Sequence, residues 1–330
     1  MNQELLRQLS VITEEERSIL SGSKEVNRAL YYDSEKSRGA SNEIDSARVL
    51  TNGKLIDLRP HVRFIHFPRH THNFVEFIYM CQGSTTHIID GQTIVLREGD
   101  LLFLNQHAAQ EILPAGENDI AVNFMILPEF FDTAFRMMGN EDNALRTFII
   151  SCLTEQNRGG NYLYFQVADV LPIQNLMENL IWIMKSDLPN RRSLSQHTMG
   201  LLFLLLTNYA DKISVSGSSY EQNMIIHLLS YVENNYKNAS LSNFAQQNSI
   251  DDYTLSRMIK KNTGSTFKEL LQEKRLNQSC FLLTNTDLSV ADIAIAVGYD
   301  NTSFFHRLFR RTYDMSPKEY RAKEGISSDT

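Results

Sequence analysis

Basic side chains gather in two short stretches near the end of the chain. Residues 253–261 and 304–311 each hold three basic residues and no acidic one. An arginine can donate two parallel hydrogen bonds to O6 and N7 of guanine, and both arginine and lysine pair with phosphates. These stretches could bind DNA even on a chain of net charge −7, although two solvated helix faces would have the same composition.

The two basic stretches lie in a pattern that occurs twice. Residues 245–271 and 294–321 align at an offset of about 50, which places 258–261 on 308–311 and 265–269 on 315–319. Each copy has a short helical stretch with a central alanine, followed by a helical stretch rich in hydroxyl and basic residues. A bracing helix followed by a reading helix is a helix-turn-helix, so the repeat predicts two such motifs in tandem.

Helical periodicity separates inward from outward side chains in each copy. The residues expected to face inward are Leu255, Ile259, Phe305, Leu308 and Phe309. The outward and basic residues predicted to contact DNA are Tyr253, Ser256, Arg257, Lys260, Lys261, Thr302, Ser303, His306, Arg307, Arg310 and Arg311. Among these we predict that Arg257 and Arg307 read bases and that the other basic residues hold phosphates.

The tail over residues 221–323 resembles the DNA-binding domain of AraC/XylS-type regulators. The residues that carry the resemblance are Ile293, Ala294, Gly298, Tyr299, Phe304, Phe305, Arg307, Phe309, Arg311, Ser316, Pro317, Glu319, Tyr320 and Arg321. The resemblance implies base contacts from Tyr253, Ser256, Arg257, Ser303, Phe304 and Arg307. Asp314 stands where the family usually has glycine, and we expect aspartate to tolerate the same turn.

The stretch between the two copies, residues 267–285, has the composition of one long helix. At 1.5 Å per residue such a helix is roughly 30 Å long. That length can hold two reading helices about one duplex turn, near 34 Å, apart. A single chain could then engage successive major grooves on one face of the DNA.

A second set of residues with potential chemistry lies in the first half of the chain. His70, His72 and Glu76 follow a spacing in which two imidazoles and a carboxylate on neighbouring strand positions can share a metal ion. Together with Gly83, they resemble the first motif of the cupin family. The stretch from Gly99 to Gln110 resembles the second motif.

The second motif departs from the cupin pattern at one position. Gln110 stands where the remaining histidine ligand would be, and an amide is a poor replacement for imidazole. We therefore predict no catalytic metal and no cofactor. Over residues 60–127 the chain instead is similar to the effector-binding cupin domains that are joined to this type of DNA-binding domain.

The resemblance implies a small-molecule effector, often a sugar, in the barrel. The predicted effector-binding residues are His70, His72, Glu76, Asn105, His107 and Gln110. These polar groups suit hydroxyls, and the aromatic side chains of Phe74, Phe77 and Tyr79 would pack against ring carbons. The alternative is that His70 and His72 only form hydrogen bonds within a loop.

The composition of the chain limits the classes of protein to which it can belong. The 330 residues suffice for two or three domains, with 42% hydrophobic and 22% charged residues. The three cysteines form no CxxC pair, which argues against a disulfide framework or a zinc module. The N-terminus lacks the apolar core of a signal peptide, and the longest apolar run, 199–206, is well below the roughly 18 residues that span a bilayer. We expect a cytoplasmic protein.

The alternation of short apolar runs with turns, followed by helical periodicity, predicts an α+β multidomain fold. The predicted parts are a helical or irregular arm at 1–53, a cupin-like β-barrel at 54–128, a helical dimerisation segment at 129–213, a flexible linker at 214–220 and the all-α DNA-binding domain with two helix-turn-helix motifs at 221–325. Apolar helix faces near 171–186 and 194–213 suggest a homodimer.

Two classes of function remain open at this point. The favoured hypothesis is a sequence-specific transcription regulator that binds double-stranded DNA and responds to a small-molecule effector, a carbohydrate, and that is not an enzyme. The alternative is an enzyme: a cupin metalloenzyme tethered to a DNA-binding domain, or a DNA-repair protein with a reactive cysteine. The metalloenzyme is disfavoured because Gln110 replaces a histidine ligand. The repair protein is disfavoured because no Cys/His cluster lies near a basic stretch.

Overall fold

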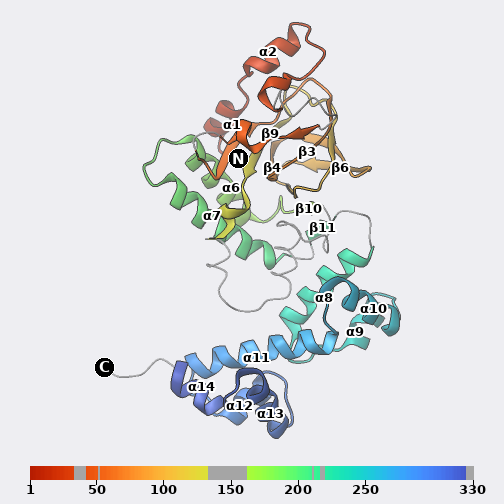
Figure 1. Cartoon of the computed structure of the whole chain (residues 1–330), viewed down its shortest axis with the longest axis vertical. Helices are drawn as coiled ribbons and strands as arrows, with labels where there is room; N and C mark the ends of the chain where they lie inside the picture. The colour runs from red at the N-terminus through yellow and green to blue at the C-terminus, as the bar shows by residue number, and fades with distance from the viewer. Residues whose placement is uncertain (33–41, 51–52, 133–161, 210–211, 216–219, 325–330) are drawn as a thin grey trace. The chain divides into compact units, whose positions relative to one another are not determined.

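The structure is a computed structural model that describes residues 1–32, 42–50, 53–132, 162–209, 212–215 and 220–324. Among these residues a first unit ends at Asn223 and a second unit begins at Met224. The described part of the first unit contains a β-barrel with flanking helices, and that of the second contains helices (Figure 1). The α+β fold class predicted from the sequence is confirmed.

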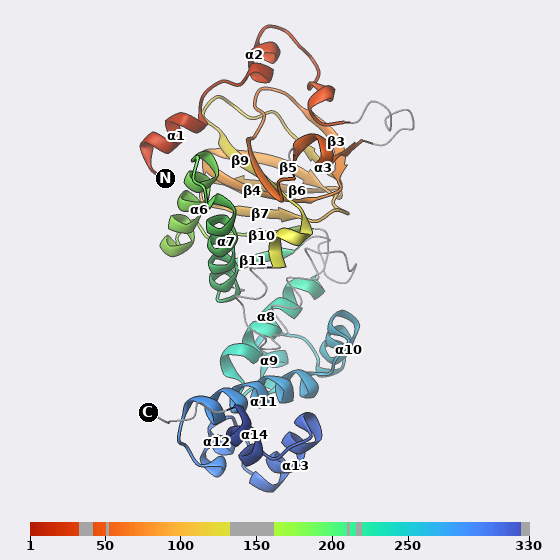
Figure 2. The same cartoon turned by 60° about the vertical axis from the view of Figure 1, so that its left-hand side comes forward.

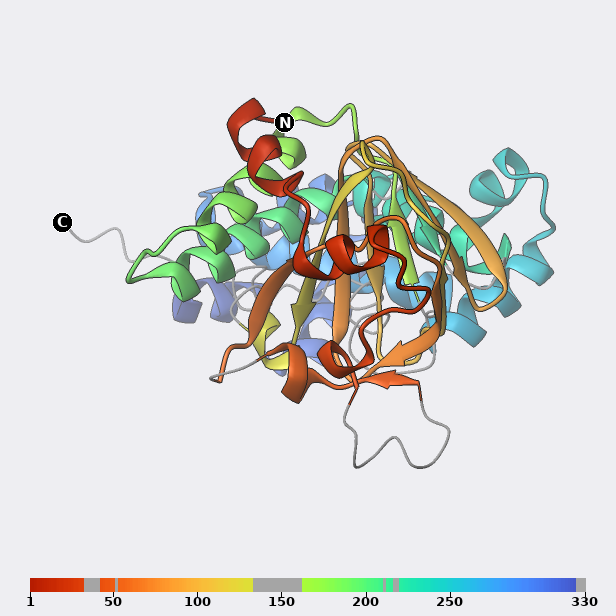
Figure 3. The same cartoon turned by 90° about the horizontal axis from the view of Figure 1, so that it is seen from above.

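The arm begins with two short helices, α1 (Gln3–Leu9) and α2 (Glu14–Leu20). Thr13 and Glu16 form a capping box at the start of α2. The Thr13 hydroxyl accepts the Glu16 N–H at 3.2 Å, and the Glu16 carboxylate accepts the Thr13 N–H at 2.8 Å. The short 3-10 helix η1 (Arg28–Leu30), strand β1 (Glu43–Ile44) and helix α3 (Ser46–Val49) follow. Figure 3 shows α2 lying over the barrel strands and α1, next to the N-terminus, lying beside the green helices.

Two sheets form the barrel (Figure 2). The five-stranded sheet has the order β1-β3-β8-β5-β6, with β3 (Phe67–His72), β8 (Gln110–Ile112), β5 (Ser84–Ile89) and β6 (Gln92–Arg97). The six-stranded sheet has the order β11-β10-β7-β4-β9-β2, with β11 (Ile213–Val215), β10 (Tyr162–Phe165), β7 (Leu101–Leu104), β4 (Val75–Gln82), β9 (Ile120–Ile126) and β2 (Ile56–Pro60). The turn predicted at Asp90-Gly91 joins β5 to β6 and has positive φ at both residues.

The six-stranded sheet has two different apolar faces. Ile78 and Leu102 face the interior of the barrel, whereas Phe77 on the same strand as Ile78 stacks on Phe103 with ring centroids 4.1 Å apart on the other face. Helices α6 (Leu171–Lys185) and α7 (Arg191–Thr207) cover that second face, where Phe203 lies 5.5 Å from Phe103. The short helix η3 (Pro128–Phe131) packs beside α7.

The segment predicted to be helical from 129 to 213 also contains strands. β10 pairs with β7 and β11 with β10, so both extend the barrel sheet. The apolar run 162–165 is too short to show a period, and only its pairing with β7 makes it a strand. Helix α7 ends at Thr207 rather than near 213, strand β11 occupies the first two residues of the predicted linker, and residues 133–161 lie outside the described part.

Burial within one chain removes the argument made from sequence for a dimer. The apolar faces of α6 and α7 were expected to need a partner, but Ile173, Leu180 and Leu206 are each fully buried inside the first unit. Helices α6 and α7 pack on one another and on the sheet. Trp182 and Leu201 stay 56% and 47% exposed. Among the described residues, no helix is long and apolar enough to cross a membrane.

The described second unit begins with α8 (Tyr220–Asn235), whose first residues precede the unit boundary. It continues with α9 (Leu241–Gln247), α10 (Asp252–Thr263), α11 (Phe267–Asn285), α12 (Val290–Ala296), α13 (Thr302–Tyr313) and α14 (Pro317–Glu324). The pairs α9–α10 and α12–α13 are the two predicted helix-turn-helix motifs. The 19 residues of α11 form the single helix that was expected between them.

Candidate functional site

A cavity of about 50 Å³ lies at one end of the barrel interior. The arm supplies Tyr31, Ile44 and Val49 to its wall, and the barrel supplies Arg59, Pro60, His61, Val62, Phe67, His70, Phe74, Glu76, Ile112, Asn123 and Met125. The volume holds only a few water molecules. A larger ligand therefore has to displace part of this wall, and Tyr31 and Val49 of the arm are wall residues that lie outside the barrel sheets.

Glu76 is at the centre of the polar wall. One carboxylate oxygen accepts a hydrogen bond from Asn123 Nδ2 at 2.7 Å, and the other accepts one from Gln110 Nε2 at 3.2 Å and lies 3.3 Å from His72 Nε2. Burial raises the pKa of this carboxyl, but the His72 ring and the hydrogen bonds outweigh burial and bring it to about 2. Glu76 is therefore a buried anion at neutral pH.

Three imidazoles near Glu76 are uncharged at neutral pH. Burial lowers the pKa of His70 to about 4 and that of His87 to about 3, and it also lowers the pKa of His61. His70 Nδ1 lies 2.8 Å from the Pro68 carbonyl oxygen. Neutral imidazoles of this kind can both donate and accept hydrogen bonds.

Several buried polar atoms of this cluster have no hydrogen-bond partner within the described part of the chain. They are Nε2 of His61, Nδ1 of His72, Nδ1 of His87 and Oε1 of Gln110. Leaving a buried donor or acceptor unpaired costs roughly 1–3 kcal/mol, so such a cluster suits a polar ligand that completes its bonds. His61 lines the cavity, with Nδ1 3.0 Å from Asn123 Oδ1 and Nε2 unpaired within the same described part.

The structure brings four of the six predicted effector residues together: His70, His72, Glu76 and Gln110. Asn105 is buried in the turn after β7, where its side chain accepts the His107 N–H at 2.9 Å. The His107 side chain is exposed and does not join the cluster. Gln110 stands at the position of the third cupin histidine, and its amide donates a hydrogen bond to Glu76.

His61, His87 and Asn123 belong to the polar cluster but were not predicted from the sequence. Asn123 joins the cluster through strand pairing, because Ile78 pairs with Asn123 and Glu76 with Met125, so all four share one face of the sheet. His61 follows strand β2 in a loop, and no periodicity marks it. Its place in the cavity follows only from the folding of the barrel.

The aromatic residues proposed for ring packing divide between the two faces. Phe74 lines the cavity. Phe77 and Tyr79 are wrong candidates, because side chains alternate along β4 and these two point toward the helices. The Tyr79 hydroxyl donates to Gln174 of α6 at 2.8 Å.

The cluster does not meet the requirements of a metal centre. Within the described residues, no group of three or more His, Cys, Asp or Glu side chains is placed to hold a metal ion. The two carboxylate oxygens of Glu76 are engaged by amide donors, and Gln110 occupies the position of an imidazole ligand. The donor set fits a hydrogen-bonding ligand better than a metal ion.

In the second unit, the two reading helices have the same construction. Asp251 caps α10 by accepting the Thr254 N–H at 2.8 Å, and Asn301 caps α13 by accepting the Phe304 N–H at 2.9 Å. Each helix ends in a left-handed residue, which is Gly264 in the first copy and Asp314 in the second. Asp314 has φ of 55°, so aspartate adopts the turn as expected.

The turns between bracing and reading helices also match. The Ile250 N–H donates to the Ala245 carbonyl at 3.0 Å, and the Tyr299 N–H donates to the Ala294 carbonyl at 2.9 Å. Both alanines are buried, which explains the central small residue of each copy. The second turn is one residue longer than the first, as the bounds of the helices show.

Gly298 is required by close packing in the second turn. Its φ is 96°, and a Cβ atom there would lie 2.5 Å from the Lys237 carbonyl oxygen. Arg275 of α11 holds this region together, since Nε donates to the Tyr236 carbonyl at 2.8 Å and the guanidinium lies over the Tyr299 ring. The turn of the second motif is thereby fixed to α8 and α11.

The predicted DNA-contacting residues lie on the exposed sides of α10 and α13. Those exposed are Tyr253, Ser256, Arg257, Lys260, Lys261, Ser303, Phe304, His306, Arg307, Arg310 and Arg311, and Thr302 is half-buried. The opposite sides are buried through Leu255, Met258 and Ile259 in α10 and Phe305, Leu308 and Phe309 in α13. Within the described part of the chain, neither Arg257 nor Arg307 forms an ion pair with a carboxylate.

Comparison with known proteins agrees with this geometry. Residues 61–202 match the family described as an AraC-like ligand binding domain, and residues 244–323 match a helix-turn-helix domain. The chain is 25% identical over 269 residues to the HTH-type transcriptional activator RhaS of Klebsiella pneumoniae (strain 342), covering 81% of this chain and 91% of that protein. It is 24% identical over 267 residues to RhaS of Escherichia coli (strain K12 / DH10B), with the same coverage.

Among solved structures, the C-terminal domain of AraT, a response regulator from Geobacillus stearothermophilus, is 30% identical and covers 34% of this chain and 94% of its own, with a TM-score of 0.32. Fatty acid-bound ToxT from Vibrio cholerae is 15% identical, covers 81% of this chain and 94% of its own, and has a TM-score of 0.34. Two family matches and an alignment along most of the chain establish the assignment. The chain belongs to the AraC family of DNA-binding transcription regulators, with a ligand-binding domain followed by a helix-turn-helix domain.

Proposed function

We propose that the effector of this regulator is a small hydroxylated molecule, a carbohydrate, that binds in the barrel cavity. The observation that carries the proposal is the buried Glu76 anion beside His61, whose Nε2 has no partner in the described part of the chain. Hydroxyl groups can donate to the carboxylate and bond to the imidazole at once. Phe67 and Phe74 add the apolar wall against which ring carbons pack.

The same proposal assigns base reading to Arg257 and Arg307. The two arginines occupy equivalent exposed positions on α10 and α13, six residues after the respective caps Asp251 and Asn301. An effector that binds one arrangement of the protein better than another shifts DNA binding by that difference in affinity, typically 1–3 kcal/mol. Changing Glu76 should therefore change the response to the effector and leave the DNA contacts themselves in place.

A homodimer is part of the proposal. Trp182 and Leu201 on α6 and α7 are large apolar side chains that are about half exposed. A second copy of the chain is the partner we propose for these two exposed side chains, which are not among the apolar residues buried within the chain. We also propose a cytoplasmic location, where such a regulator meets its DNA.

We propose that the chain is not an enzyme, since the relatives named above are transcription regulators. Among the described residues, Cys81 is buried and Cys280 is half-buried, and burial raises the pKa of both thiols, which disfavours a thiol-based repair reaction at either of them. Both thiols would be poor nucleophiles at neutral pH.

The test of the effector site combines calorimetry with DNA binding. A panel of monosaccharides and sugar acids is titrated into the full chain, and into Glu76→Gln, which keeps the side-chain volume and removes the charge. A binding site for the chain is first selected from random DNA duplexes, and its affinity is measured by fluorescence anisotropy with and without each compound. Binding that is equal in both proteins, or turnover of a compound, would contradict the proposal.

A further inference from the structure

Arg59 lies on the cavity side of the edge strand β2. It pairs in register with Asn123 of β9, and Asn123 donates to Glu76 of β4. Directly paired residues of neighbouring strands share a face of the sheet, so Arg59 shares the face of the Glu76 cluster. The residues that line the cavity include all three. Two inter-strand steps of about 4.8 Å separate the backbones of β2 and β4.

Arg59 is half-buried and lacks a strong partner within the described part of the chain. Its guanidinium donates one long hydrogen bond, at 3.5 Å, to the Leu30 carbonyl, and no carboxylate described in the structure lies within ion-pair distance. Asp57, on the same strand and face, is paired with Lys54 at 2.8 Å. The nearby Glu15 carboxylate accepts the Tyr31 hydroxyl at 2.6 Å.

Glu76 and Arg59 therefore give the polar wall of the cavity two ends of opposite charge. The Glu76 end carries a buried negative charge and neutral imidazoles, so it accepts hydroxyl groups and repels an anion. The Arg59 end offers a planar guanidinium, which pairs with carboxylates through two parallel hydrogen bonds. A neutral hydroxyl oxygen can accept one hydrogen bond from the guanidinium, whereas a carboxylate accepts two in parallel and also neutralises its charge.

We infer that the effector is a sugar acid, whose carboxylate pairs with Arg59 while its hydroxyl groups donate to Glu76 and bond to His61. This inference rests on the proposed carbohydrate function and names the chemical class within it. The arm residue Tyr31, which lines the same cavity, would close over the sugar acid.

The test compares acids with their neutral counterparts in calorimetric titrations of the full chain. The probe pairs are galacturonate with galactose, glucuronate with glucose, and gluconate with sorbitol. We expect at least one acid to bind tenfold or more tightly than its neutral counterpart, which corresponds to about 1.4 kcal/mol. Arg59→Gln should abolish that preference by weakening the acid at least tenfold more than its neutral counterpart, whereas Arg59→Lys should retain part of it.

Arg69→Gln is the matched control, because Arg69 is exposed on β3 and its substitution changes the net charge equally. If a neutral sugar binds as tightly as its acid and Arg59→Gln has no effect, the sugar-acid inference is overturned while the carbohydrate site stands. If no compound of either class binds, both are overturned. Loss of the preference in Arg69→Gln as well would show that net charge and not Arg59 selects the acid, which also overturns the inference.

Discussion

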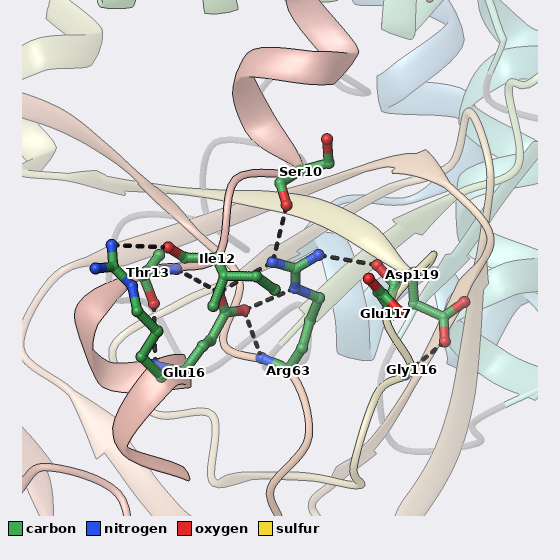
Figure 4. Close-up of polar contacts among 9 residues, drawn as sticks. Ser10, Ile12, Thr13, Glu16, Arg63, Gly116, Glu117 and Asp119 are labelled. Atoms are coloured by element: carbon green, nitrogen blue, oxygen red, sulfur yellow. Dashed lines mark hydrogen bonds and ion pairs between the residues drawn. The ribbon is translucent and has the colours of Figure 1, made fainter. Parts of the chain in front are cut away.

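Arg63 and Glu16 form a buried ion pair that fastens the arm to the barrel (Figure 4). The guanidinium donates to both Glu16 carboxylate oxygens, at 2.7 and 3.0 Å, and both side chains are almost completely buried. It also donates to the carbonyls of Glu117 at 2.8 Å and Ser10 at 3.2 Å. One residue thus connects the loop between α1 and α2 with the loop between β8 and β9.

We expect Glu16→Ala to destabilise the first unit by about 3–5 kcal/mol, because it leaves a buried guanidinium without its counter-charge. Urea unfolding followed by circular dichroism measures the change, with Glu14→Ala on the exposed side of α2 as the control. Burial raises the Glu16 pKa, but the bonds to Arg63 outweigh it and the pKa is lowered. The stabilisation is therefore present above the unfolded-state pKa and is lost as the pH falls through the folded-state pKa. An equal cost for both variants would show that the pair contributes nothing.

Arg257→Ala and Arg307→Ala should each weaken specific DNA binding by about 1–3 kcal/mol and relax the preference at one base position. Lys261→Ala should instead weaken all sequences alike and reduce the slope of affinity against salt by about one. Fluorescence anisotropy with selected and random duplexes separates the two outcomes. Lys268→Ala, on the exposed start of α11, is the control. A uniform loss in the arginine variants would exclude their role as base readers.

The buried imidazoles should make the first unit sensitive to acid. In the unfolded chain they bind protons near pH 6.5, whereas in the folded barrel the pKa of His70 is about 4 and that of His87 is about 3. Stability should therefore decline as the pH falls from 6.5 toward 4, because only the unfolded state takes up protons in this window. Thermal unfolding between pH 8 and 4 records the slope. His87→Asn should reduce it, and exposed His107→Asn should not.

Gly298→Ala should cost clearly more stability than Gly264→Ala. Both glycines have positive φ, so alanine is strained at each by more than about 1 kcal/mol. Only at Gly298 does the new Cβ also meet backbone, the Lys237 carbonyl oxygen. Chemical unfolding of the second unit within the full chain measures both. Equal losses would mean that conformational strain alone explains the glycine.

The proposed dimer can be tested through Trp182, which is the only tryptophan in the sequence. Its side chain is 56% exposed in the single chain, so its emission should shift to shorter wavelength as association covers it. We expect the shift to follow concentration over the same range as sedimentation reports dimers. Trp182 emission that stays unchanged while dimers form would place the interface elsewhere, and monomers at tens of micromolar would exclude the dimer.

Most of the second unit could be predicted from the sequence. The 3.6-residue spacing of Leu255, Ile259, Phe305 and Phe309 is a local signal, because a helix forms its hydrogen bonds within its own segment, and the repeat shows that the signal occurs twice. The strands with flanking turns were predicted from another local signal, the alternation of short apolar runs with turn residues. Aligning the two copies also identified which residues of each reading helix face outward.

The set of residues that line the cavity could not be predicted from the sequence, because it depends on the tertiary structure. Whether His61, Asn123 and Arg59 meet Glu76 depends on which strands pair and in which register, and strand pairing joins residues far apart in the chain. The same applies to β10, whose four apolar residues become a strand only beside β7. The apolar faces of α6 and α7 could not reveal from sequence that the sheet of their own chain covers them, since periodicity shows that a face is buried and not against what.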